Sequence, residues 1–121
     1  MRWLLHGNMT PAVRDAIVRH GDTATLASEL ELPADAPAED VYKVAQSKQL
    51  DLMTTDAQLA QYPFEHAVKF NRSLVFLQLE GGDVEQDDAI DRLFERYKRM
   101  SAGRLYTVTA SRVKVRQLPT H

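Results

Sequence analysis

The sequence contains no cysteine, which excludes a disulfide framework and any zinc site built from thiolates. Long apolar runs are also missing from its start, where the longest apolar stretch is Trp3, Leu4 and Leu5. A signal peptide needs an apolar region of about 7–15 residues, and a membrane span needs about 20. We therefore expect a cytoplasmic protein that has no membrane partner and whose core is held together by packing.

The composition is that of one globular domain. The chain has 121 residues, of which 44% are hydrophobic, and this is enough for one packed core. Neither an internal repeat nor a low-complexity stretch is present. We expect a single domain that spans residues 1–121.

The net charge of −2 hides an uneven distribution of charges. Between Asp15 and Glu65 there are ten acidic and three basic residues, whereas between Asp91 and Arg116 there are two acidic and eight basic residues. An acidic cleft beside a basic surface suits a metal-using enzyme that acts on a phosphodiester backbone. The alternative is that these charges are the ordinary solvated faces of a helix and a hairpin.

Strand and helix patterns alternate along the first half of the chain. Thr10 and Pro11 form a good helix start, and Gly21 a good helix end. The elements that we predict are a strand at Arg2–Leu5, a helix from Pro11 to His20, a short strand at Asp22–Leu26, a loop at Glu29–Pro37 and a helix at Glu39–Lys48.

The second half continues this alternation and ends in a strand pair. The run Ser73–Leu79 is almost entirely apolar, as in a central strand buried on both faces. The predicted elements are a strand at Leu50–Thr54, short helical pieces within Ala57–Asn71 that break near Pro63, the strand at Ser73–Leu79, a long helix entered through Gly81-Gly82-Asp83 and closed by Gly103, and strands at Arg104–Thr109 and Val113–Leu118.

These elements predict an α/β fold of three layers. Parallel strands need crossover connections, which are right-handed in nearly all proteins, so the first four strands should form a mostly parallel sheet with helices on its faces. The final strand pair should extend or flank this sheet.

The predicted ligand site lies at the carboxyl edge of the sheet, where open α/β sheets bind ligands. His6, Gly7 and Asn8 follow the first strand, and Thr54, Thr55 and Asp56 end the third. Glu39 and Asp40 begin the intervening helix and can approach the same edge. We expect Asp56, Glu39 and Asp40 to be catalytic, Asp56, Asp40 and His6 to bind Mg²⁺ or Mn²⁺, and Asn8 and Thr54 to support them.

The four residues expected to be catalytic or to bind the metal each have a simpler interpretation. Asp56 can cap the helix that follows it, and His6 can be a hydrogen-bonded residue at the end of a strand. Glu39 and Asp40 lie in the first turn of a helix, where acidic side chains favour the helix dipole without any further function.

The order of several motifs resembles that of small PIN-like proteins associated with bacterial toxin–antitoxin systems. The segment Trp3–Met9 is similar to their opening strand and acidic turn, and Thr54-Thr55-Asp56 is similar to their Thr-x-Asp motif. The ending, Gly103–Thr109 followed by Arg112–Pro119, is similar to their Gly-Arg, strand, Arg, strand and Leu-Pro tail. The resemblance covers nearly the whole chain.

This resemblance implies a PIN-like domain and a metal-dependent ribonuclease that uses Mg²⁺ or Mn²⁺. It makes RNA the expected substrate, with Arg112, Lys114 and Arg116 as its phosphate contacts. It also implies that the chain is the toxin of a pair, with a cognate antitoxin over the cleft and a homodimer formed through a helical face.

Two alternatives follow from the residues that differ from the family pattern. The first family aspartate falls on His6 and a later acid falls on Gln58, so the chain can also be an inactive PIN-like module that binds RNA or a protein partner. A strand ending in an aspartate near position 56 is also typical of phospho-acceptor receiver domains. These need an acidic pair after the first strand, where this chain has His6-Gly7.

Overall fold

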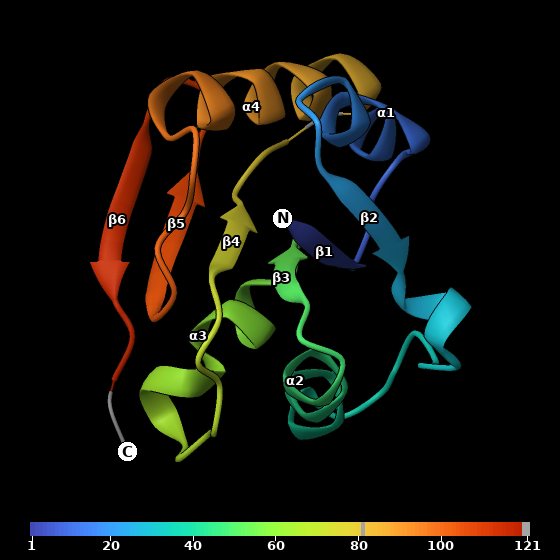
Figure 1. The fold of residues 1–121 in the computed structure, drawn as a ribbon, viewed down its shortest axis with the longest axis vertical. Coiled ribbons are helices and arrows are strands. Elements are labelled where there is room, and N and C mark those ends of the chain that lie inside the picture. Colours follow the sequence, from blue (N-terminus) through green and yellow to red (C-terminus); the bar gives the residue numbers. More distant parts are fainter. Residues whose placement is uncertain (81, 120–121) are drawn as a thin grey trace.

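The computed structural model describes residues 1–80 and 82–119. Within this part of the chain, six strands form one sheet with helices on both of its faces (Figure 1). The elements are β1 (Arg2–His6), α1 (Pro11–Arg19), β2 (Thr23–Leu26), the 3₁₀ helix η1 (Ala27–Leu30), α2 (Ala38–Ser47), β3 (Asp51–Thr54), α3 (Ala57–Glu65), β4 (Leu74–Leu77), α4 (Asp83–Arg96), β5 (Arg104–Val108) and β6 (Val113–Gln117).

The sheet has the order β2-β1-β3-β4-β5-β6. Strands β1 to β5 are parallel, and β6 pairs antiparallel with β5. The predicted α/β fold with a mostly parallel sheet and a C-terminal strand pair is therefore confirmed. Gly81, the first residue of the predicted entry to α4, lies outside the described residues, and the helix begins at Asp83, the last residue of that entry. No helix in the described part of the chain is both long enough and apolar enough to cross a membrane.

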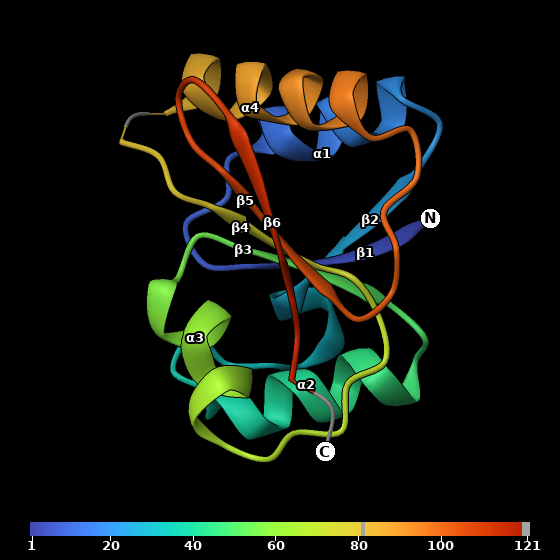
Figure 2. The same cartoon turned by 90° about the vertical axis from the view of Figure 1, so that its left-hand side faces the viewer.

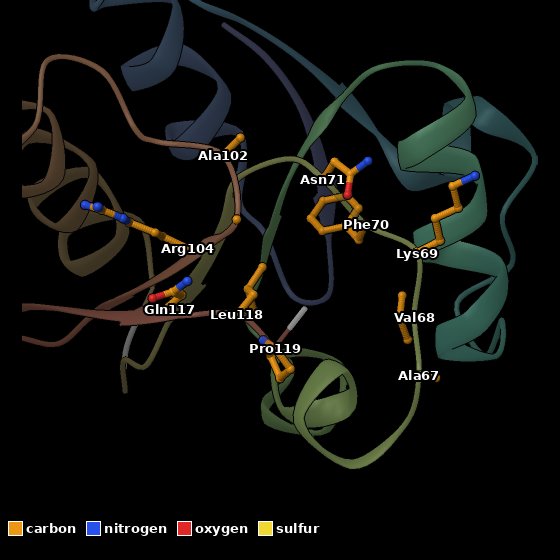
Figure 3. Close-up of a pocket in the computed structure, with 11 residues that line it drawn as sticks. Ala67, Val68, Lys69, Phe70, Asn71, Ala102, Arg104, Gln117, Leu118 and Pro119 are labelled. Carbon is orange, nitrogen blue, oxygen red and sulfur yellow. The ribbon is translucent and has the colours of Figure 1, made fainter. Parts of the chain in front are cut away.

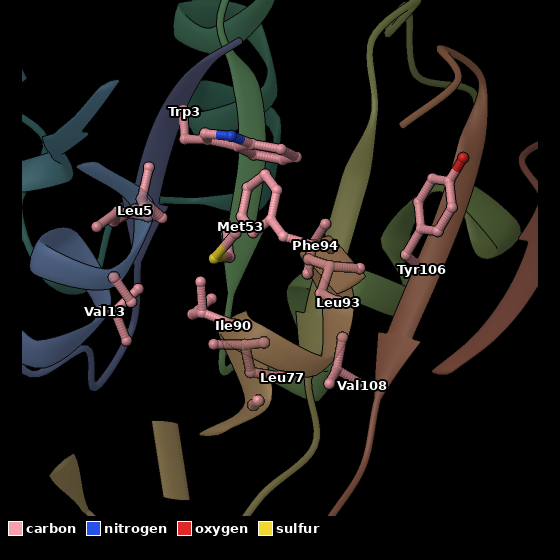
Figure 4. Packing of buried hydrophobic residues seen from close by; sticks show 14 of the residues in the cluster. Trp3, Leu5, Val13, Met53, Leu77, Ile90, Leu93, Phe94, Tyr106 and Val108 are labelled. Carbon is pink, nitrogen blue, oxygen red and sulfur yellow. The ribbon is translucent and has the colours of Figure 1, made fainter. Parts of the chain in front are cut away.

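Alternation of side chains along each strand creates a core on both faces of the sheet. Trp3 and Leu5 of β1 pack with α1 and α4 on one face, whereas Leu4 packs with α2 and α3 on the other (Figure 2). Figure 4 shows the first of these cores, in which Met53 and Leu77 from neighbouring strands lie against residues of α4. Burial on both faces explains why the parallel strands are apolar almost throughout.

The connection between β4 and β5 departs from the expected handedness. The crossovers through α3 and α4 advance in the same direction across the sheet, but α3 and α4 lie on opposite faces. The two crossovers therefore have opposite handedness. Figure 2 shows that the connections through α1, α2 and α3 are right-handed and that the one through α4 is left-handed. The three crossovers that join the first four strands are therefore right-handed, as expected, and the left-handed one is the further connection to β5. Burial explains the exception, because α4 covers Met53, Leu77 and Val108 beside α1.

Two predicted helix limits are also wrong. Helix α4 ends at Arg96 instead of continuing to Gly103, and Tyr97 is extended with its ring against Tyr106. Six more helical residues would carry the chain about 9 Å along the axis, past the point from which it returns to β5. The region after β3 forms one helix, α3, and Pro63 lies inside it instead of breaking it.

Candidate functional site

The strand order reverses between β1 and β3, and this places their carboxyl ends side by side. From β1 the chain moves to β2 on one side and then returns to β3 on the other side. In such sheets the crevice outside the strand ends at this switch point is where ligands bind. His6, which ends β1, is the register partner of Thr54, which ends β3. The structure thus brings His6, Asn8, Thr54 and Asp56 to one edge, as predicted.

Three hydrogen bonds join the two strand ends at this switch point, and a fourth lies within the turn after β3. The hydroxyl of Thr54 lies 2.9 Å from His6 Nδ1 and accepts the Asp56 N–H at 3.0 Å. The hydroxyl of Thr55 accepts the Asn8 N–H at 2.8 Å, and the Thr55 N–H donates to the His6 carbonyl at 3.3 Å. Thr54 therefore contacts the predicted residues His6 and Asp56, and Thr55, which the sequence did not single out, makes a second link between the strand ends.

Asp56 caps helix α3, as the simpler interpretation proposed. Its Oδ1 accepts the backbone N–H groups of Gln58 at 2.8 Å and Leu59 at 3.4 Å. The side chain is exposed, and its Oδ2 forms no hydrogen bond with the described residues. One carboxylate oxygen therefore has a structural role, and the other faces solvent beside the switch point.

His6, at the end of β1, is buried, with 8% of its surface exposed. Burial lowers the pKa of its imidazole, and the negative charge of Asp56 opposes this shift in part. Since Nδ1 lies against the Thr54 hydroxyl, Nε2 is the ring atom left to meet a ligand, and it forms no hydrogen bond with the described residues.

This burial predicts that acid destabilises the protein through His6. In the unfolded chain the imidazole takes up a proton near pH 6.5, whereas the lowered pKa keeps it neutral in the folded protein. The free energy of unfolding should therefore fall as the pH decreases below about 6.5, until the folded-state pKa is reached. Urea unfolding between pH 5 and 8 should show a smaller decrease for His6→Asn. Parallel curves for the two proteins would contradict the assignment to His6.

Gln86 of α4 fixes the loop that follows His6, and sequence analysis missed it. Its Oε1 accepts the Thr10 N–H at 3.0 Å, and its Nε2 donates to the Asn8 carbonyl at 3.0 Å. Its position in the sequence could have indicated a buried polar side chain, because Gln86 lies four residues before Ile90 and so on the apolar face of the helix. Thr10 precedes α1 as predicted, but its hydroxyl has no hydrogen-bond partner among the described residues.

Glu39 and Asp40 do not join this group. Both are exposed in the first turn of α2, and the carboxylate of Glu39 lies 3.7 Å from Lys43 Nζ. The described residues contain no group of three or more histidine, cysteine, aspartate or glutamate side chains able to hold a metal ion together. Asp56 and His6 alone do not fit a resident Mg²⁺ or Mn²⁺ ion, because hard cations are held mainly by several oxygen ligands.

Arg112, Lys114 and Arg116 form a row of exposed cations, which we call the basic row. They alternate along β6 and its first flanking residue, so their side chains share one face of the sheet. The guanidinium carbon of Arg116 lies 3.8 Å from the centre of the Phe64 ring, which places the row on the face covered by α3. Arg112 is at the edge of the sheet that carries the switch point.

Comparisons with protein-family models, curated proteins and solved structures find no match.

The residues at the strand ends argue against the receiver alternative. The parallel strands follow the order 2-1-3-4-5, which receiver domains share with other doubly wound folds. Phosphorylation in such a domain needs an acidic pair after β1 and a lysine after a late strand. In this structure β1 ends at His6 and Gly7 follows it, and Thr109 and Ala110 follow β5. The strand order alone is compatible with that family, whereas the left-handed connection through α4 and the residues at the strand ends are not.

A hollow of about 880 Å³ lies at the opposite edge of the sheet (Figure 3). It is lined by residues from the segment before β4, the start of β5 and the end of β6, including Phe70, Arg104 and Leu118. Parallel strands begin at this edge, whereas the switch point is where they end. The described lining residues include no predicted site residue, so this hollow is separate from the candidate site.

Proposed function

We propose that this protein is a PIN-like module that binds single-stranded RNA through the basic row. The observation that carries the proposal is the exposed row of three cations beside an aromatic ring on one face of β6. Cationic side chains bind phosphates without regard to sequence, and aromatic or guanidinium planes stack on unpaired bases. The resemblance to PIN-like proteins supports the same class of ligand.

The switch point lies within reach of RNA bound in this way. Arg112 and Asp56 are at the same edge of the sheet, and β4 and β5 separate β3 from β6. Three strand spacings amount to about 14 Å, which a short oligonucleotide spans. RNA bound to the row can therefore pass over the exposed Asp56 and the Nε2 atom of His6.

Metal-dependent cleavage of RNA is the second candidate function. The observation that favours it is the exposed carboxylate of Asp56 at the switch point, close enough for its charge to act on the buried imidazole of His6. Mg²⁺ is often held by one or two carboxylates together with substrate phosphates. Within the part of the chain that the structure describes, the site lacks the further acids of a resident ion site, so RNA binding without cleavage is the function that the geometry supports best.

Removal of two cations from the row should weaken RNA binding and its dependence on salt. For single strands, each phosphate contact contributes about 0.7 to the slope of log affinity against log salt concentration. We therefore expect Arg112→Gln/Lys114→Gln to lower this slope by about 1.4, measured by fluorescence anisotropy with a labelled oligonucleotide. Lys43→Gln/Lys48→Gln is the matched control, because it removes the same charge from α2 and its C-cap residue. Equal slopes for both double variants would contradict the proposal.

Cleavage is tested on the same samples with Asp56→Asn. Asparagine caps helices as well as aspartate does, so this variant should keep α3 intact while it removes the negative charge. Calorimetry with Mg²⁺ and Mn²⁺, with and without RNA, shows whether an ion binds. Cleavage by the wild type that disappears in Asp56→Asn would favour the nuclease, and RNA binding without cleavage in either protein would favour the binding module.

A further inference from the structure

Strand β6 has an open hydrogen-bonding edge. The Leu118 N–H donates to the Gly103 carbonyl, and the Thr109 N–H donates to the Arg112 carbonyl. In an antiparallel pair such bonded positions alternate with unbonded ones, so Arg112, Lys114 and Arg116 direct their backbone groups toward β5. The N–H and C=O groups of Val113, Val115 and Gln117 therefore point outward, and Figure 2 shows β6 uncovered in front of the sheet.

The two faces of this edge strand differ in chemistry. The basic row occupies the face toward α3, whereas Val113 and Val115 face the α4 side. Val115 is 38% exposed, which makes it one of the large apolar side chains that the described structure leaves open. A strand added beside β6 would thus meet three cations on one face and two valines on the other.

We propose that β6 binds an extended segment of a partner protein as a seventh strand, and that this segment alternates acidic and apolar residues. Main-chain hydrogen bonds to Val113, Val115 and Gln117 would give affinity, and charge pairing with the basic row would set the register. A second copy of this chain fits poorly. Two antiparallel β6 strands in one continuous sheet would place basic row beside basic row, and like charges across a strand pair are destabilising.

The added strand would occupy the basic row and so compete with RNA. Only this consequence rests on the proposed function, because strand addition itself depends on the open backbone edge. RNA binding and strand addition can be tested separately. RNA phosphates need only the cationic side chains, whereas an added strand needs both these side chains and the outward N–H groups of β6.

The probe is a fluorescein-labelled heptapeptide in which glutamate and valine alternate, and the control peptide has the same residues in two blocks. The wild type should bind the alternating peptide more tightly. Val115→Pro removes one outward N–H, and proline is tolerated on an edge strand whose N–H faces solvent. We expect this variant to bind the peptide about tenfold more weakly, the loss expected for one good hydrogen bond, and to keep its RNA affinity. Val115→Thr is the control that retains the N–H.

Hydrogen exchange on the wild type is a second measurement, and it does not depend on whether a variant folds. Added peptide should slow exchange of the Val113, Val115 and Gln117 amides, and excess peptide should displace labelled RNA. Equal binding of both peptides, unchanged exchange at these amides, or full peptide affinity in Val115→Pro would each overturn the proposal. Failure of the peptide to bind at all would do so too, and would leave the basic row with RNA binding or with protection of the edge against self-association.

Discussion

Replacing Gly7 by alanine is expected to lower the free energy of unfolding by about 2–5 kcal/mol. Gly7 has a φ of 92°, a conformation that costs an L-residue roughly 1–2 kcal/mol. A Cβ at this position would overlap the Oγ1 atom of Thr55, and forced packing of this kind costs about 1–3 kcal/mol more. Because Thr55 also bonds to the Asn8 N–H, relief of the overlap would disturb the link between the two strand ends.

Gly21→Ala separates the cost of the backbone conformation from the cost of the overlap with Thr55. Gly21 has a φ of 88°, but a Cβ there meets no heavy atom within 4 Å, so only the backbone cost of roughly 1–2 kcal/mol should appear. Urea unfolding of both variants measures the difference. In a double-mutant cycle, Thr55→Ala should recover part of the loss caused by Gly7→Ala. Equal losses at Gly7 and Gly21, or strict additivity with Thr55→Ala, would show that the overlap does not control this turn.

The parts of the fold that the sequence predicted depend on local patterns. The apolar run around Val75 identifies a strand buried on both faces, and the alternation around Val113 identifies an edge strand. Both patterns follow from which faces of a strand are buried. The carboxyl edge was also predictable, because parallel strands end together. For this reason His6 and Asp56 were expected at the same edge of the sheet, and the structure places His6 at the end of β1 and Asp56 just after β3.

The parts that were not predicted depend on contacts between segments that are distant in sequence. The left-handed crossover through α4 reflects the need to cover Leu77 and Val108, and no local pattern records on which face a helix will lie. Gln86 reaches Asn8 and Thr10 across 78 and 76 positions of sequence. The early end of α4 at Arg96 follows from the distance to β5, which the sequence of the helix does not contain.

In the candidate site, too, the features set by local sequence were predicted, and those set by contacts between distant segments were not. Asp56 precedes a helix, and its capping role could be read from that position alone. Whether Glu39 and Asp40 reach Asp56 depends on where α2 lies relative to the sheet, and the structure leaves both exposed in the first turn of that helix. The binding of Mg²⁺ or Mn²⁺ thus stays a prediction that calorimetry tests, and so do the RNA and antitoxin partners and the homodimer implied by the resemblance.

Tyr42 explains how α3 continues through Pro63. Proline has no N–H, so residue 63 cannot donate to the carbonyl of Leu59 one turn earlier, as an ordinary residue would. The buried hydroxyl of Tyr42, on α2, donates to that carbonyl instead, at 2.6 Å. Burial raises the pKa of the Tyr42 phenol, so the hydroxyl keeps its proton and the hydrogen bond is available even in alkaline solution.

Tyr42→Phe should therefore lower the free energy of unfolding by about 1–3 kcal/mol, the cost of leaving a buried carbonyl without a partner. The same substitution in a Pro63→Ala background should cost less, because the alanine N–H can donate to Leu59. Urea unfolding of the four proteins measures the coupling between the two positions. Equal losses of unfolding free energy in both backgrounds would contradict this account. A smaller loss in the Pro63→Ala background would show that the tyrosine hydroxyl replaces the hydrogen bond that proline removes from the helix.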